Sequence, residues 1–150
     1  MVTARHVPYD ALIKGLSEKF AGDKRVEVPS WVGFAKAGIH REKSWVQDDW
    51  YHIRLASTLR KVAFKGPIGI SRLSADYGGR VDRGSQGYHP AKGSRFIVRH
   101  MFQTLEKLGY VSTEKRGRII SSKGQSLLDK TAREIIESRL KENPELKKLL

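Results

Sequence analysis

The amino-acid sequence predicts a mainly α-helical fold with a winged-helix core, a small β-hairpin wing and additional N-terminal helices. Several stretches repeat apolar residues at helical spacing, and two short β-prone stretches near the C-terminal third flank a turn that contains glycine. The expected order is helix, short strand, helix, loop, helix, hairpin and helix, which is typical of a winged helix-turn-helix. At 150 residues the chain fits one domain over 1–150, with N-terminal helices at 1–47, the core at 48–140 and a tail at 141–150.

The N-terminal region is expected to hold two helices. The first covers residues 8–20, and its apolar residues share one face: Leu12, Ile13, Leu16 and Phe20. A shorter helix over residues 30–37 stops at Gly38, and residues 39–47 are expected to form a connecting loop.

The strongest helix signal begins at Asp48 and Asp49, which suit the positive end of a helix, and runs to about Phe64. One stripe is apolar and is expected to enter the core: Leu55, Ala56, Leu59, Val62 and Ala63. The opposite face is expected to meet solvent and carries Trp50, Arg54, Ser57, Thr58, Lys61 and Lys65. A tryptophan among cations can stack on a base or ribose while the cations neutralise phosphates. The other interpretation is that Trp50 covers the core and the charges only solvate the helix.

Five more elements complete the expected fold. They are a short strand over residues 68–70, a helix over 71–77, a helix over 95–108, a hairpin over 110–120 and a final helix that ends at Asn143. Ser94 is placed to cap the helix that follows it, and Ser122 with Gln125 has the spacing of a capping box. No internal repeat interrupts this order.

The charge of the chain points to a polyanionic partner. The formal net charge is +13, and residues 50–123 hold fifteen basic and four acidic side chains, so nearly all of the excess lies there. A surface this positive attracts nucleic acid, and less often an anionic membrane, unless it serves only solubility. No apolar run reaches the length of a membrane span, so no membrane partner is expected, and a cytoplasmic protein fits the absence of cysteine.

Residues 76–95 are expected to form a long loop that builds no core. They contain five of the fourteen glycines and one aliphatic residue larger than alanine. We expect the loop to be mobile in the isolated protein and to lie against RNA, with phosphate contacts from Arg80, Arg83, Lys92 and Arg95. Tyr77 and Tyr88 are candidates for stacking on bases. Gly78 and Gly79 are either a helix stop or a site of close backbone approach to RNA.

Two further basic surfaces follow the loop. Lys92, Arg95 and Arg99 fall on the outer side of the helix over 95–108, in the position of a recognition helix. The turn of the hairpin carries Lys115, Arg116 and Arg118 at the tip of the expected wing. The loop between the paired helices is far longer than in a usual helix-turn-helix, which favours irregular RNA over the major groove of DNA.

The sequence holds no constellation typical of an enzyme. The five histidines are scattered, no cysteine is present, and no phosphate-binding glycine motif or nucleophile elbow occurs. We therefore expect no catalytic activity, no metal and no cofactor. Two other functions stay open at this point: a winged-helix DNA-binding transcription regulator, which would usually be a dimer, and a basic scaffold or chaperone for acidic proteins.

Four stretches carry a resemblance to one family. They are Val28–Val32 (VPSWV), Trp50–Arg60 (WYHIRLASTLR), Tyr77–Arg80 (YGGR) and Lys92–Arg95 (KGSR), in this order and with similar spacing. The chain resembles the S19e family of small-subunit ribosomal proteins, in its archaeal form, over almost its whole length. The resemblance implies a non-catalytic constituent of the small ribosomal subunit that binds ribosomal RNA and acts in subunit maturation and translation.

The resemblance also implies partners and site residues. The expected partners are small-subunit ribosomal RNA, its precursor and neighbouring small-subunit proteins, and the isolated protein is expected to be a monomer. By analogy with the family, the helix that bears Trp50, Arg54, Arg60 and Lys61 is a basic surface used in assembly, and Arg99 matches another basic family position.

Overall fold

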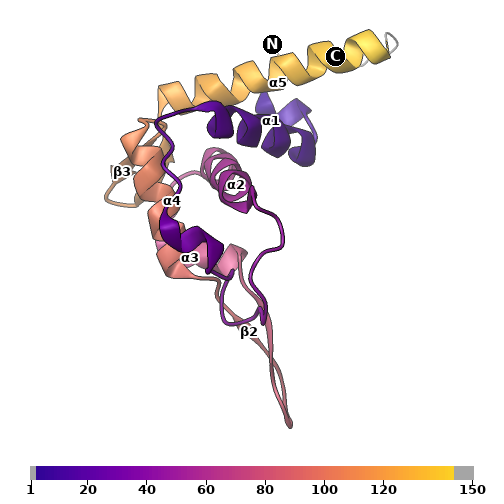
Figure 1. Cartoon of the computed structure of the whole chain (residues 1–150). Coiled ribbons are helices and arrows are strands. Elements are labelled where there is room, and N and C mark those ends of the chain that lie inside the picture. Colours follow the sequence, from indigo (N-terminus) through magenta and orange to yellow (C-terminus); the bar gives the residue numbers. More distant parts are fainter. Residues whose placement is uncertain (1–2, 144–150) are drawn as a thin grey trace.

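The computed structural model describes residues 3–143 and confirms a mainly helical fold. The helices pack together at one end of the molecule, and a long β-hairpin projects from the other end (Figure 1). The elements in chain order are the 3₁₀ helix η1 (Ala4–His6), α1 (Tyr9–Gly22), the 3₁₀ helix η2 (Ser30–Gly33), α2 (Trp50–Lys65), α3 (Ile70–Asp76), β1 (Gly79–Arg83), β2 (Gln86–Ala91), α4 (Arg95–Lys107), β3 (Val111–Glu114), β4 (Gly117–Ile120) and α5 (Ser122–Glu142).

The core lies where α1, α2, α4 and α5 meet. Most of the apolar residues predicted to face inward from α1 and α2 are buried, namely Leu12, Leu16, Phe20, Leu55, Ala56, Leu59 and Val62. Two predicted members, Ile13 and Ala63, are only half-buried. Helices α4 and α5 contribute Val98, Met101, Leu105, Leu128 and Ala132. Helix α1 packs against both α2 and α5, and α4 packs against α2 and α3. Helical spacing therefore predicted which side of each helix faces inward.

The helix ends follow local chemistry, with two corrections. Ser94 caps α4 as predicted, because its hydroxyl accepts a hydrogen bond from the Ile97 amide at 3.4 Å. The cap of α5 is Ser121 rather than the predicted Ser122: its Oγ accepts from the Gly124 amide at 3.1 Å and donates to the Gly109 carbonyl at 2.7 Å. The predicted helix over 30–37 is only the single 3₁₀ turn η2.

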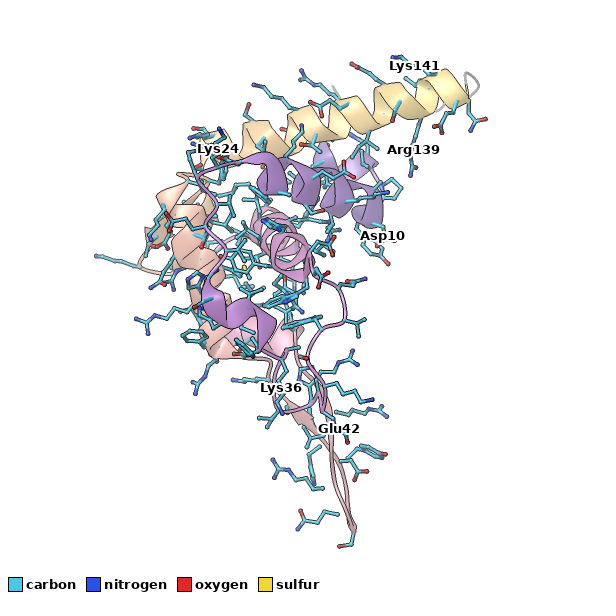
Figure 2. The ribbon with its side chains drawn as sticks, in the orientation of Figure 1. Asp10, Lys24, Lys36, Glu42, Arg139 and Lys141 are labelled. Carbon is cyan, nitrogen blue, oxygen red and sulfur yellow. The ribbon has the colours of Figure 1, made fainter. Side chains whose placement is uncertain are left out.

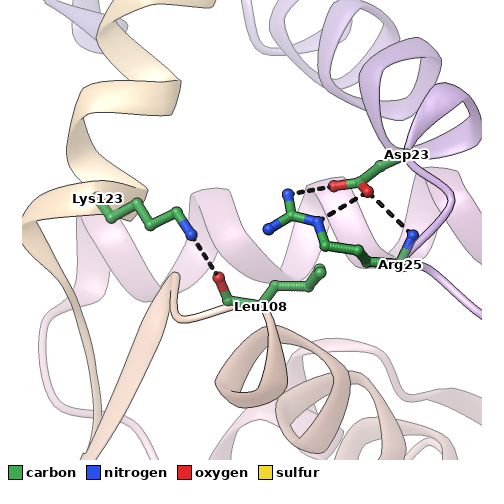
Figure 3. A network of polar contacts seen from close by, with 4 residues as sticks. All are labelled: Asp23, Arg25, Leu108 and Lys123. Atoms are coloured by element: carbon green, nitrogen blue, oxygen red, sulfur yellow. Dashed lines mark hydrogen bonds and ion pairs between the residues drawn. The ribbon is translucent and has the colours of Figure 1, made fainter.

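Polar contacts fix the junction between the end of α1, the end of α4 and the start of α5 (Figure 3). Lys123 Nζ donates to the Leu108 carbonyl at 3.1 Å, so one of the carbonyls left free at the end of α4 is satisfied. Nearby, Arg25 Nη2 donates to Asp23 Oδ2 at 2.6 Å, and the Arg25 amide donates to Asp23 Oδ1 at 3.0 Å. The chain is thereby turned out of α1 towards η2.

The hairpin β3–β4 confirms the hairpin predicted over residues 110–120. Val111 pairs with Ile120, and Glu114 pairs with Gly117 across the tight turn. The strand predicted over 68–70 is reduced to an isolated bridge, in which Ile68 and Arg118 exchange both backbone hydrogen bonds at 3.1 and 2.9 Å. Gly117 is required there, since its φ is +136° and an added Cβ would lie 2.8 Å from the Ile68 carbonyl carbon.

Residues 76–95 are not the irregular loop that we predicted. They form the antiparallel hairpin β1–β2, in which Gly79 pairs with Ala91 and Arg83 pairs with Gln86. The turn has Gly84 at φ +77°, and Asp82 Oδ1 accepts a hydrogen bond from the Gly84 amide at 3.0 Å. The segment still builds no core, because most of its side chains are exposed. Backbone pairing alone gives it regular structure.

Candidate nucleic-acid interface

Tyr77 organises the outer face of α2. Its ring lies between two cations of that helix, with Arg54 Cζ at 3.9 Å and Lys61 Nζ at 3.7 Å from the ring centroid. Its hydroxyl donates to Ser57 Oγ at 2.9 Å. These three α2 residues and Tyr77 therefore form one layer that holds the end of α3 against α2.

This arrangement corrects the expectation that the outer face of α2 is free in solvent. Arg54, Ser57 and Lys61 are half-buried, and Thr58 is fully buried. Burial lowers the pKa of Arg54, which the Tyr77 hydroxyl partly offsets, and burial also lowers the pKa of Lys61, against the opposing influence of Asp76. The Tyr77 ring is likewise engaged by Arg54 and Lys61, and its stacking on a base stays a prediction.

Trp50 is buried, so the prediction of an exposed tryptophan is wrong. Only 5% of its surface is exposed, and its ring stacks on Trp45 with centroids 3.8 Å apart and an interplanar angle of 11°. The loop before α2 folds back to supply this partner. The interpretation in which Trp50 covers the core is the one that the structure supports.

Two other basic residues of α2 are also held by protein contacts. Arg60 lies away from Tyr77, with its guanidinium carbon 4.7 Å from the Phe64 ring centroid and 5.7 Å from that of Tyr9. Lys65 is ion-paired with Asp76 at the end of α3. Both side chains therefore make contacts within the protein, Arg60 with aromatic rings and Lys65 with a carboxylate.

Gly78 and Gly79 are required by protein packing. A Cβ on Gly78 would lie 2.1 Å from the Ala91 carbonyl oxygen, and one on Gly79 would lie 2.8 Å from Cδ2 of His40. Both glycines have ordinary φ values, so neither takes the left-handed conformation typical of a glycine after a helix. They let the foot of the β1–β2 hairpin pass close to its own second strand and to the loop after η2.

The hairpin foot and this loop enclose an open cleft of about 820 Å³. Its lining combines exposed apolar residues with cations, namely Ile39, Val46, Tyr88, Arg41, Lys43, Arg54 and Arg80, and it also includes Glu42 and Asp82. Lys36 and Glu42, labelled in Figure 2, lie beside the foot of the hairpin. The cleft is an open surface feature of mixed charge.

The predicted cations outside α2 are mostly exposed. Arg80, Arg83, Lys92, Arg95, Arg99, Lys115 and Arg116 all point into solvent, from the hairpin, α4 and the β3–β4 turn. Lys92 also donates from Nζ to Ser71 Oγ at 2.9 Å. These seven residues, here called the exposed cations, are placed to meet phosphates without disturbing the core.

Arg118 differs from the other basic residues of the β3–β4 hairpin. It is half-buried, its Nε donates to Glu106 Oε1 at 3.3 Å, and its guanidinium carbon lies 5.1 Å from the Phe102 ring centroid. The Arg118 side chain therefore ties β4 to α4, whereas Lys115 and Arg116 in the turn are exposed.

Comparison with known proteins gives the family. The model of the ribosomal protein S19e family matches residues 3–138. The chain is 46% identical to the small ribosomal subunit protein eS19 of Thermoplasma acidophilum, over the full length of both chains. It is 44% identical to eS19 of Aeropyrum pernix, again over both full lengths, and 31% identical to eS19B of Schizosaccharomyces pombe over 91% of this chain and 96% of the relative.

The chain belongs to the ribosomal protein S19e family. The resemblance noted from the sequence motifs is thereby confirmed. S19e proteins are ribosomal proteins of the small subunit, structural rather than enzymatic, and this assignment does not favour a transcription regulator. Within residues 3–143, no group of three or more His, Asp or Glu side chains is arranged to hold a metal ion. None of the helices in that range is long and apolar enough to cross a membrane.

The S19e motifs acquire a physical meaning from this geometry. In YGGR, Tyr77 locks α3 to α2, the two glycines allow the hairpin to leave, and Arg80 lines the cleft. Sequence reasoning missed His40 and Trp45, which the loop brings to the hairpin foot and to Trp50. Their signal was weak, because no helical or strand periodicity marks residues in an irregular loop.

Proposed function

We propose that this S19e chain is a structural constituent of the small ribosomal subunit, where it binds ribosomal RNA and takes part in subunit maturation and translation in the cytoplasm. The observation that carries the proposal is the set of exposed cations on the β1–β2 hairpin, α4 and the β3–β4 turn of this chain. The chain is also 46% identical to a small ribosomal subunit protein over 150 residues. Clustered cations neutralise phosphates and position a protein on RNA. Neighbouring small-subunit proteins are the expected protein partners, and the isolated chain is a monomer.

The same proposal includes a single domain with a winged-helix core over residues 48–140. Helices α2, α3 and α4, the Ile68 bridge and the β3–β4 hairpin follow the order of that motif. Helix α4 takes the place of the recognition helix, and Lys115 and Arg116 are at the tip of the wing. The hairpin β1–β2 is an insertion between α3 and α4 that extends the basic surface away from the helices (Figure 1).

We assign two kinds of contribution to the predicted RNA-binding residues. The exposed cations contact phosphates directly. The remaining residues fix the surface that presents them, and any RNA contact they make is through atoms left open at its edge: Trp50, Arg54, Ser57, Arg60, Lys61, Lys65, Tyr77, Gly78, Gly79 and Arg118.

Helix α5 bears on the alternative of a dimeric DNA-binding regulator. Such a protein needs an apolar face beyond the needs of its own core. In the described part of the chain, the exposed large apolar residues are Tyr9, Val28, Phe34, Ile39, Val46, Tyr88 and Phe96. None belongs to α5, whose apolar side packs on α1 and the core.

Ultraviolet crosslinking in the native cells tests the proposal. Sequencing of the attached nucleic acid is expected to return small-subunit ribosomal RNA, with crosslinks made by residues 76–118 and by the edge of α2. Crosslinks to promoter DNA, or their absence from ribosomal RNA, would overturn it. A Lys115→Glu, Arg116→Glu variant supplies a matched measurement of RNA affinity against salt concentration. The slope of this dependence is expected to fall by about 2, because two phosphate contacts are lost.

A further inference from the structure

Three aromatic side chains lie at the surface around the end of η2 and the start of α4, and two of them are largely exposed. We call Trp31, Phe34 and Phe96 the aromatic patch. Phe34 is 90% exposed and Phe96 is 61% exposed, and the Trp31 and Phe96 ring centroids are 5.1 Å apart. The Phe34 amide donates to the Trp31 carbonyl at 3.1 Å, and residues three apart in a 3₁₀ turn lie on the same side. Trp31 and Phe96 thus lie together, and Phe34 follows one turn after Trp31.

The inner side of the patch is fixed by the fold. Trp31 packs edge-on against His100 and Tyr51, with centroid separations of 5.2 and 6.4 Å. The Tyr51 hydroxyl is in turn within hydrogen-bond distance of Thr104 Oγ1 at 3.2 Å and His100 Nδ1 at 3.3 Å. Trp31 is therefore held rigidly from below, while Phe34 and Phe96 remain outside. Large apolar side chains that a protein exposes next to one another mark a binding surface.

The two segments that carry the aromatic patch are themselves basic. The two segments that build it, residues 28–38 and 91–105, contain no Asp or Glu. They contain four cations, Lys36, Lys92, Arg95 and Arg99, and all four are exposed. Arg99 is three residues after Phe96 on α4, so their side chains are neighbours. Positive charge therefore accompanies the rings on both segments, which fits an anionic ligand with flat apolar parts.

We propose that the aromatic patch binds single-stranded RNA, with unpaired bases stacked on the rings of Phe34 and Phe96 and phosphates at Arg95 and Arg99. The proposal rests on the ribosomal RNA function above and adds a single-strand site to it. Aromatic rings beside cations stack any base, whereas duplex RNA keeps its bases inside the helix. An apolar protein segment would need a groove to dock into, and the Phe34 ring, which is 90% exposed, has no groove wall around it. A base needs only one free ring face to stack on.

Binding of two RNA probes by the purified full-length chain tests the proposal. One probe is a uridine strand of about 12 nucleotides, within the usual site size for single-strand binding, and the other is a duplex of similar length. Phe34→Ala and Phe96→Ala are each expected to weaken binding of the strand by about 5- to 150-fold, the loss of one stacked base. Binding of the duplex is expected to change less than about twofold, because its bases do not reach the rings.

Three control variants separate stacking from folding and from charge. Phe96→Trp keeps a ring and is expected to retain strand binding. Tyr9→Ala removes another exposed aromatic ring, on α1 outside the aromatic patch, and is expected to bind both probes normally. Arg99→Glu is expected to weaken both probes. Thermal unfolding of each variant verifies the fold, which exposed side chains should leave unchanged.

The outcomes distinguish this proposal from the function on which it rests. If Arg99→Glu weakens both probes while the two alanine variants bind the strand normally, the single-strand site is overturned and the ribosomal RNA function stands. If the wild-type chain binds neither probe, both proposals are overturned. If an acidic, apolar peptide binds in a way that depends on Phe34 and Phe96 while the uridine strand does not, the patch is a protein-docking surface and the proposal is wrong.

Discussion

Replacing Arg54 with glutamate is expected to lower the free energy of unfolding by about 3–5 kcal/mol. The guanidinium carbon lies 3.9 Å from the Tyr77 ring centroid, and a partly desolvated cation–π contact stabilises by about 2 kcal/mol. The new carboxylate would face the negative side of the same ring in a half-buried position, at a further cost of about 1–3 kcal/mol for an unsatisfied polar group. The sequence alone had placed Arg54 in solvent, where this substitution would be harmless to the fold.

Urea unfolding followed by circular dichroism measures this effect, with Arg99→Glu as the matched control. Arg99 is exposed, so the same change of charge there is expected to alter the unfolding free energy by less than about 0.5 kcal/mol. For a chain of this size, the loss at Arg54 corresponds to a decrease in Tm of about 6–20 °C. Equal stability of the two variants would refute the sandwich of Tyr77 between Arg54 and Lys61 as a structural element.

Three further predictions concern packing and pH. Gly78→Ala is expected to lower the free energy of unfolding by about 1–3 kcal/mol and to speed hydrogen exchange of the β1–β2 amides, because the new Cβ would meet the Ala91 carbonyl oxygen. Gly87→Ala in the same hairpin is the control, since its Cβ meets no atom within 4 Å. Equal exchange in the two variants would contradict the steric reason. Leu59→Ala is expected to cost about 2–5 kcal/mol in urea unfolding, since Leu59 is fully buried, and a loss under about 1 kcal/mol would contradict the core assignment. Burial lowers the pKa of His40, His52 and His100, so the unfolded chain binds more protons than the folded chain near their ordinary pKa of 6.5. The free energy of unfolding is therefore expected to be highest above that pH and to decrease as the pH falls through the folded-state pKa values. An increase in this free energy when the pH is lowered from about 7.5 to about 5 would exclude the linkage.

Local patterns were sufficient for the long helices and for the β3–β4 hairpin. The stripe that includes Leu55, Leu59 and Val62 shows which side of α2 is buried, because helical spacing places these residues on one line. Ser94 before α4 and the glycine in the β3–β4 turn are likewise signals carried by a few neighbouring residues. Such features need no knowledge of the rest of the fold.

The outer face of α2 needed tertiary information. A helical wheel gives the direction of Trp50 and Arg54, but not what lies there. Trp45 covers one from an irregular loop, and Tyr77 covers the other from the end of α3. The helix face opposite the apolar stripe is therefore exposed to solvent only where no other segment of the chain covers it.

The hairpin β1–β2 was not predicted because residues 76–95 carry almost no aliphatic side chains that would mark strands. Val81 and Tyr88 flank a tight turn at Gly84, a hairpin signal that the scarcity of aliphatic residues obscured. Its pairing depends on main-chain hydrogen bonds and on the close approach at Gly78, neither of which requires apolar side chains. Whether these amides exchange rapidly without RNA remains a separate prediction about mobility.

Because η1 and α1 pack against α5, the newly made chain cannot complete its N-terminal packing until α5 has been synthesised. The Ala4 amide of η1 donates to Asp129 Oδ1 at 3.1 Å, and Lys19 Nζ of α1 lies 2.6 Å from Glu134 Oε2, so the partners are separated by more than a hundred residues. Until residues 122–142 have been synthesised, one apolar side of α1 has no cover. Contacts between distant residues form slowly and leave hydrophobic surface open in the meantime. A chain stopped before α5 is therefore expected to be a substrate for chaperones and proteases rather than a smaller version of the protein.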